Sequence, residues 1–136
     1  AAGDITDEAT VREIFARANE LGAVGVLVNN AGIPPQGMGL SSFVQETTES
    51  WRQFVDINVY GVAFMTRAAL PAMIEQGWGR IVTIVSDSAR VGDPNLAMYA
   101  GSKAAAAAIM RSVAGEVGRF GVTCNSISSA RSGCRG

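Results

Sequence analysis

The spacing of apolar residues changes along the chain between a helical and a strand-like period. After Thr6, apolar residues recur every three or four positions, which predicts an amphipathic helix that Thr6 or Asp7 caps and Gly22 ends. Residues 24–30 (VGVLVNN) form a β-branched run with apolar residues at successive positions, as expected for a strand buried on both faces. The same patterns predict a helical segment over 49–75, a strand over 80–86, a helix over 96–119 and a strand over 121–128.

Two stretches interrupt these elements. Residues 33–42 are rich in Pro and Gly and carry no charge, so they are predicted as a loop that is either a wall of a substrate site or a plain surface connection. Gly61 and Pro71 lower the helix propensity within 49–75, which predicts two helices or one kinked rod.

Helices and strands alternate in the predicted order, and this order decides the fold class. Three strands that alternate with helices form a parallel sheet through right-handed crossovers. The sequence therefore predicts an α/β fold: a Rossmann-like doubly wound parallel sheet, as part of a three-layer α/β/α domain. Residues 1–136 are expected to form one partial domain, because 136 residues are too few for two ordinary domains.

Composition removes several classes of function. Lys and Arg total 11 against 12 Asp and Glu, so no basic field exists to attract nucleic acid or an anionic membrane. The absence of histidine excludes His-based triads, and two cysteines supply neither the usual zinc site nor a disulfide framework. No apolar run reaches the ~18 residues that span a bilayer. We expect no metal, nucleic-acid or membrane partner, and a cytoplasmic location.

Candidate chemistry lies between Ser86 and Lys103. Tyr99 and Lys103 are four residues apart in a helix-favouring segment, so they are expected one turn apart on one helix face. An ammonium about 4 Å from a phenol favours the phenolate by roughly 4 kcal/mol at an effective dielectric of ~20. Ser86 ends the strand over 80–86, which brings its hydroxyl to the sheet edge where ligands bind; Ser88 is a nearby alternative.

Each of these residues also has a purely structural interpretation. A Tyr–Lys pair at this spacing is usually an ordinary side-chain pair on a helix. Asn58, on the apolar face of the helical segment, would by itself more often be a satisfied core amide than a catalytic group. The sequence NNAG at 29–32 could be an Asx turn at a strand end, although its small residues would also let a flat cofactor approach the backbone.

Taken in order, NNAG at 29–32, DINVYG at 56–61, Ser86 and the YxxxK pair Tyr99–Lys103 resemble the short-chain dehydrogenase/reductase family. The resemblance runs from about Asp4 to Ile127 and implies a catalytic half over 24–128. It implies an enzyme that uses NAD or NADP to interconvert an alcohol and a ketone or aldehyde, with a small-molecule substrate. It also implies a homo-oligomer, a dimer or tetramer, in which the Ala-rich helix over 96–119 packs either within the chain or between subunits.

The resemblance also assigns roles. Ser86 would bind the substrate oxygen, Tyr99 would transfer the proton, and Lys103 would favour the phenolate and bind the nicotinamide ribose. Asn58 would help hold a water molecule behind the lysine. The residues expected to touch the cofactor are Asp4 at the adenine, Asn30, Ala31 and Gly32 at the adenosine side, and Tyr99 and Lys103 at the nicotinamide.

Three departures from the family pattern leave alternatives open. The glycine-rich turn TGxxxGxG is missing, Gly25 stands where an acidic residue is frequent, and SARSGCRG at 129–136 replaces a Pro-Gly turn. We therefore expect an internal piece of a larger enzyme that lacks the N-terminal cofactor motif and is inactive alone. The alternatives are a non-catalytic fragment or oligomerisation module, and an epimerase or dehydratase of the same family.

Overall fold

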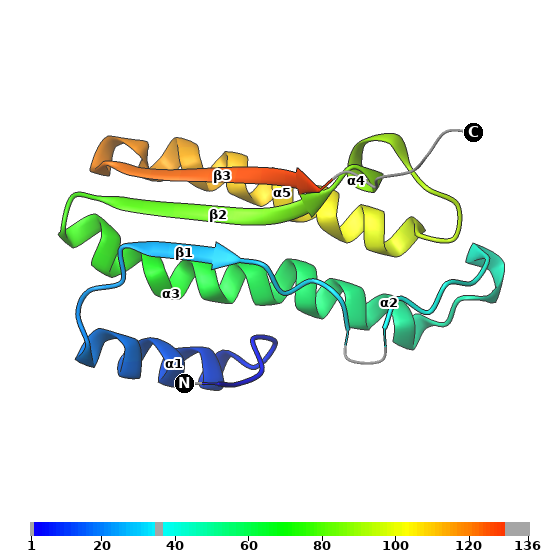
Figure 1. Cartoon of the computed structure of the whole chain (residues 1–136), viewed down its shortest axis with the longest axis horizontal. Coiled ribbons are helices and arrows are strands. Elements are labelled where there is room, and N and C mark those ends of the chain that lie inside the picture. Colours follow the sequence, from blue (N-terminus) through cyan, green and yellow to red (C-terminus); the bar gives the residue numbers. More distant parts are fainter. Residues whose placement is uncertain (1, 35–36, 130–136) are drawn as a thin grey trace.

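The computed structural model describes residues 2–34 and 37–129, and these form a sheet of three parallel strands (Figure 1). The strands are β1 (Val26–Asn29), β2 (Gly79–Ser86) and β3 (Val122–Ser129), in the spatial order β1–β2–β3. In the register, Val28 lies opposite Val82, and Ile84 lies opposite Ile127. All three strands point the same way, so their carboxyl ends share one edge of the sheet.

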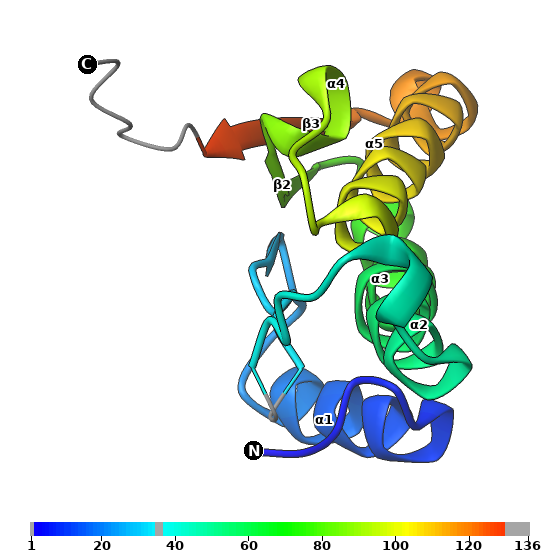
Figure 2. The ribbon, with the colours of Figure 1, turned by 90° about the vertical axis from the view of Figure 1, so that its right-hand side faces the viewer.

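The main helices lie on one face of this sheet (Figure 2). Helix α3 (Val62–Glu75) packs on β1 and β2, α5 (Ala97–Val117) packs on β2 and β3, and α1 (Glu8–Glu20) packs beside α3. Right-handed crossovers that step in the same direction place their helices on the same face. The predicted fold class, a partial Rossmann-like α/β sheet, is confirmed, and the described residues contribute the sheet and one helical layer.

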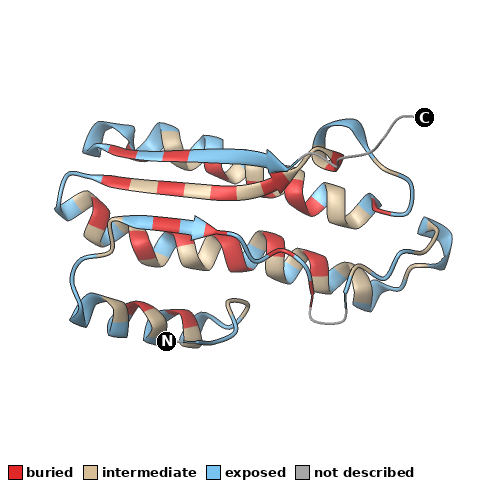
Figure 3. Cartoon of the chain, viewed as in Figure 1, coloured by how far each residue is buried: buried red, intermediate tan, exposed pale blue. Residues whose placement is uncertain are grey.

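Burial along the strands follows this arrangement (Figure 3). Leu27, Ile81 and Val122 face the helices and are buried, whereas Val26 and Val28 on the other face are 56% and 55% exposed. The prediction that residues 24–30 are buried on both faces is therefore wrong. Its physical reason is that no element in the described part of the chain covers the second face.

The helical segment predicted over 49–75 is one continuous rod. Helix α2 (Thr48–Val55) passes through a π-helical turn, η2 (Asp56–Gly61), directly into α3. Pro71 lies in α3 without ending it, whereas Gly61 belongs to the π turn itself. A π turn inserts one extra residue into a helix, and such turns occur frequently at functional sites.

The remaining boundaries follow local chemistry. Asp7, of the two expected candidates, caps α1 by accepting hydrogen bonds from the Ala9 and Thr10 amides. The sequence did not predict the short elements η1 (Phe43–Gln45), α4 (Ser88–Val91) and η3 (Gly118–Phe120). By length and composition, the rod Thr48–Glu75 could also cross a membrane. It packs against α1, α5 and the sheet, and 33% of its most apolar stretch is buried.

Candidate active site

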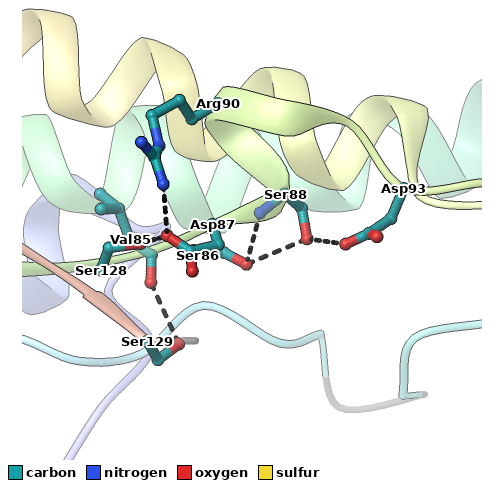
Figure 4. Close-up of polar contacts among 8 residues, drawn as sticks. All are labelled: Val85, Ser86, Asp87, Ser88, Arg90, Asp93, Ser128 and Ser129. Carbon is teal, nitrogen blue, oxygen red and sulfur yellow. Dashed lines mark hydrogen bonds and ion pairs between the residues drawn. The ribbon is translucent and has the colours of Figure 1, made fainter. Parts of the chain in front are cut away.

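Ser86 is the last residue of β2, as predicted, and its hydroxyl lies in a small polar cluster (Figure 4). Its Oγ lies 3.1 Å from the Ser88 Oγ and accepts a hydrogen bond from the Ser88 amide at 3.3 Å. Ser86 is partly exposed, whereas Ser88 is buried and donates its hydroxyl to Asp93. Of the two serines, Ser86 is therefore the less buried one.

Lys103 comes to the same edge of the sheet from α5. Its side chain is only 4% exposed, and its Nζ donates a hydrogen bond to the Ile84 carbonyl at 2.8 Å, two residues before Ser86. No carboxylate in the described residues lies within ion-pair distance of it. Because burial disfavours the ammonium, the pKa of Lys103 is lowered from its usual value. A buried cation without a counter-charge costs stability, so a functional role is the favoured explanation.

Tyr99 lies one turn before Lys103, as expected from their spacing. The Lys103 Nζ is 5.9 Å from the centroid of the Tyr99 ring. The Phe54 ring, from α2, meets the Tyr99 ring edge-on at a centroid distance of 5.9 Å. Phe54 is buried, so it holds one side of the tyrosine ring. Sequence reasoning missed this contact, because the two aromatic residues belong to different helices.

Asn58 and Gly32 complete the cluster around the lysine. The Asn58 Nδ2 donates to the Gly32 carbonyl at 3.1 Å, while the fully buried Oδ1 has no hydrogen-bond partner among the described residues. A Cβ atom at position 32 would lie 2.8 Å from this Oδ1 and would collide with the Lys103 Nζ. Only glycine fits here, so Gly32, Asn58 and Lys103 meet in one small polar space.

The residues expected at the adenosine side are split between two places. Asp4 and Ala31 line one cavity of about 540 Å³, together with Pro34, Gln53 and Asp56. The Asp4 carboxylate accepts hydrogen bonds from the Thr6 amide and hydroxyl, both at 2.8 Å. Gly32 lies instead beside Lys103, and the exposed Asn30 does not line the cavity.

Asn29 has a structural role in this region. Its Nδ2 donates to the Thr66 and Thr83 hydroxyls, each at 3.2 Å, which ties β1 to α3 and β2. All three side chains are buried. This network fixes the first asparagine of NNAG against a neighbouring strand and helix.

The residues described above are compatible with a bound nicotinamide cofactor. The cavity beside Asp4 and Ala31, the missing Cβ at Gly32 and the unpartnered Asn58 Oδ1 leave room and polar groups along the carboxyl edge of the sheet. The segment 129–136, expected to depart from the family pattern, lies outside the described residues beyond Ser129.

The parallel sheet with helices packed on it is a partial Rossmann-like fold, and the sequence comparisons agree with this fold. The short chain dehydrogenase family profile matches residues 1–131. The chain belongs to the short chain dehydrogenase family.

Two relatives illustrate the similarity. Oxidoreductase UcpA of Salmonella typhimurium is 39% identical over 126 residues, which cover 91% of this chain and 46% of that protein. The L-rhamnose 1-dehydrogenase (NAD(P)(+)) of a Sphingomonas species is 35% identical over 127 residues, which cover 92% of this chain and 48% of that protein. The chain thus spans about half the length of these relatives.

A solved structure shows the same fold. The gluconate 5-dehydrogenase of Burkholderia cenocepacia, in complex with NADP and tartrate, superposes with a TM-score of 0.88 at 27% identity. The match covers 96% of this chain and 50% of that one.

Proposed function

We propose that the full-length protein is an NAD- or NADP-dependent oxidoreductase that interconverts an alcohol and a ketone or aldehyde. The observation that carries this proposal is the buried lysine, which lies against Gly32 and one turn after Tyr99. The relatives named above include an NAD(P)(+)-dependent dehydrogenase and a dehydrogenase solved with NADP. Family membership supports the reaction type but not a particular substrate.

In the proposed reaction, the bound nicotinamide supplies or accepts the hydride at the carbon atom. Ser86 donates a hydrogen bond to the oxygen of the substrate. During reduction, the Tyr99 hydroxyl gives its proton to this oxygen, so the carbonyl becomes an alcohol and a phenolate remains; oxidation reverses both steps. The positive charge of Lys103 would stabilise the phenolate, because opposite charges attract.

The residues that would hold the cofactor lie along one edge of the sheet. Asp4 and Ala31 would contact the adenosine portion in the cavity they share. The exposed Asn30, which does not line this cavity, would contact the same portion from outside it. Gly32, Tyr99 and Lys103 would contact the nicotinamide and its ribose. Asn58 would hold a water molecule through its unpartnered Oδ1, on the path by which a proton leaves Tyr99 past Lys103.

The proposed substrate is a small alcohol or carbonyl compound. We further propose that the full-length protein is a homo-oligomer and is located in the cytoplasm. Relatives named for L-rhamnose and gluconate make polyhydroxylated compounds the first to screen. An epimerase or dehydratase remains the alternative within the family. The two are distinguished by net change of NAD(P)H absorbance during turnover, which only the oxidoreductase produces.

Tyr99→Phe tests the proposal, with Tyr60→Phe as its matched control. Tyr60 is an exposed tyrosine in the π turn, so its hydroxyl is expected to be dispensable. In the full-length protein, Tyr99→Phe should lower kcat by roughly 10²- to 10⁴-fold, the usual contribution of a general acid, while NADH and NADPH bind as before. Unchanged turnover in Tyr99→Phe would exclude the assigned role.

A further inference from the structure

The side chain of Tyr99 is held through its ring and not through its hydroxyl. The ring meets the Phe54 ring edge-on, at a centroid distance of 5.9 Å and an interplanar angle of 68°. None of the hydrogen bonds among the described residues involves the Tyr99 hydroxyl, whereas the Tyr99 backbone carbonyl accepts one from the Ser102 hydroxyl at 2.8 Å. Packing against Phe54 therefore sets the direction in which the phenol points.

Helix α5 restricts Tyr99 less than it restricts a residue of its interior. In an α-helix, the preceding turn limits the χ1 rotamers of each side chain. Tyr99 is the third residue of α5, so the residues three and four positions before it, Leu96 and Asn95, lie outside the helix. Their φ angles of −130° and 63° are not helical. The contact with Phe54 supplies part of the restriction that the helix does not.

Phe54 is buried outside the main apolar core. It is 6% exposed, but it lies apart from the core cluster that buried residues of α1, α3, α5 and the strands form. Phe15, by contrast, is 7% exposed and belongs to that cluster. The Phe54 ring therefore packs at the candidate site, where Tyr99 is its aromatic neighbour among the described residues.

Two helical segments present matching pairs of side chains to each other. Both α2 and the π turn η2 contact α5 (Figure 2). Phe54 meets Tyr99, and one turn further along each segment the Asn58 Oδ1 and the Lys103 Nζ both lie beside Gly32. A phenylalanine ring has no hydrogen-bonding group, so it can fix the phenol without competing for its proton.

We propose that Phe54 is a positioning residue, which holds the Tyr99 ring in the orientation for proton transfer. The inference rests on the proposed function, because it concerns the proton donor of that reaction. A proton moves only between atoms within hydrogen-bond reach. A ring that turned among several rotamers would present its hydroxyl to the substrate for only part of the time. Phe54 does not touch the substrate in this role and acts through Tyr99.

The first test measures turnover in the full-length protein with Phe54→Leu, which keeps an apolar side chain but removes the ring. We expect kcat to fall by about tenfold to a hundredfold, the scale of a misplaced catalytic group, while the Kd for NADH or NADPH changes by less than about twofold. Phe15→Leu is the matched control, because it removes a similarly buried ring from the core. It should lower stability and leave kcat within about twofold of the original. An unchanged kcat in Phe54→Leu would overturn the inference.

The second test separates action through Tyr99 from a general structural effect. In a Tyr99→Phe background, Phe54→Leu should cause no further loss of kcat, because residues that act as one unit are not additive. A loss as large as the one in the original protein would mean that Phe54 acts independently of the Tyr99 hydroxyl. That result would also overturn the inference.

The third test needs no turnover, so it distinguishes failure of the inference from failure of the proposed function. In NMR spectra of full-length protein with labelled tyrosine, the Tyr99 ring signals are identified by their loss in Tyr99→Phe. The ring current of Phe54 shifts these signals, so they should move in Phe54→Leu and stay in place in Phe15→Leu. Signals that stay in place in Phe54→Leu would overturn the inference whatever the reaction. Signals that move in a protein that turns over no alcohol or carbonyl compound would support the role of Phe54 in holding the ring and overturn only the proposed function.

Discussion

Lys103 is the residue of the candidate site whose burial is electrostatically most unfavourable. It is the only lysine in the sequence, it is 4% exposed, and a backbone carbonyl is its hydrogen-bond partner. A lysine placed for stability alone would lie at the surface, where its ammonium is hydrated. Its buried position beside Gly32 and Asn58 is therefore unusual for a lysine and agrees with the role proposed for it.

The lowered pKa of Lys103 predicts a specific pH dependence of stability. Between this lowered pKa and the unfolded value of 10.5, the unfolded chain binds more protons than the folded one, so stability rises with pH. The free energy of unfolding of the original protein minus that of Lys103→Met should therefore increase as the pH rises toward ~10.5. Above this pH, the difference should be constant. Each unit by which the pKa is lowered contributes about 1.4 kcal/mol.

Denaturant unfolding at several pH values measures this difference in the cofactor-free protein. Carbon NMR of labelled lysine, with the Lys103 signal assigned by its loss in Lys103→Met, gives a second, direct measurement of its titration. A titration midpoint at or above 10.5, or a stability difference that is constant with pH, would contradict the expectation.

Single residues of the site were predictable where they lie at fixed spacing on one element. Tyr99 and Lys103 share a helix, and Ser86 ends a strand, so period and element type were sufficient. Asp93 was not predicted, because it reaches Ser88 only through left-handed backbone at Gly92 and Asn95. Positive φ at a non-glycine residue is a property of the folded loop that no periodic pattern reveals.

Among the elements, strands and long helices were predicted to within two residues, whereas the short helical turns were missed. The π turn Asp56–Gly61 illustrates the reason: its residues continue the apolar face of α2 and α3, and its wider hydrogen bonds leave no trace in that pattern. The π turn is instead associated with a tertiary contact. A Cβ at Gly61 would lie 2.8 Å from the Ile5 Cδ1, so the turn accommodates the N-terminal loop.

The packing of α3 on β2 predicts opposite effects for two glycine substitutions. A Cβ at Gly79, at the start of β2, would lie 2.6 Å from the Cβ, Cγ and Sδ atoms of the fully buried Met73. Gly79→Ala should therefore lower the free energy of unfolding by about 1–3 kcal/mol. Gly115→Ala, in α5 with open space around its Cα, should raise it by about 0.5–1 kcal/mol.

Chemical denaturation of the full-length protein measures both changes. Met73→Ala should itself cost about 2–5 kcal/mol and removes the Cγ and Sδ contacts, while the contact with the Cβ of residue 73 remains. Gly79→Ala should therefore cost less in the Met73→Ala background than in the original protein. Equal losses in the two backgrounds would mean that the Cγ and Sδ atoms of Met73 are not the cause.

At the scale of the whole molecule, the two faces of the sheet differ in a way that the sequence alone did not reveal. The strand pattern was continuous in apolar residues, which correctly indicated a parallel sheet. In the described residues, only the face toward α3 and α5 is covered, and Val26, Val28 and Ile127 on the other face are 54–56% exposed. The chain spans about half the length of the relatives named above.

A charge placed on the open face tests whether the full-length protein covers it. Val28→Asp should lower the free energy of unfolding of the full-length protein by on the order of 3 kcal/mol, through lost apolar burial and desolvation of a carboxylate. Ala16→Asp, on the exposed side of α1, is the control and should cost about 1 kcal/mol or less. Equal, small losses for the two variants would mean that Val28 remains open to water, and that this face does not belong to the core of the full-length protein.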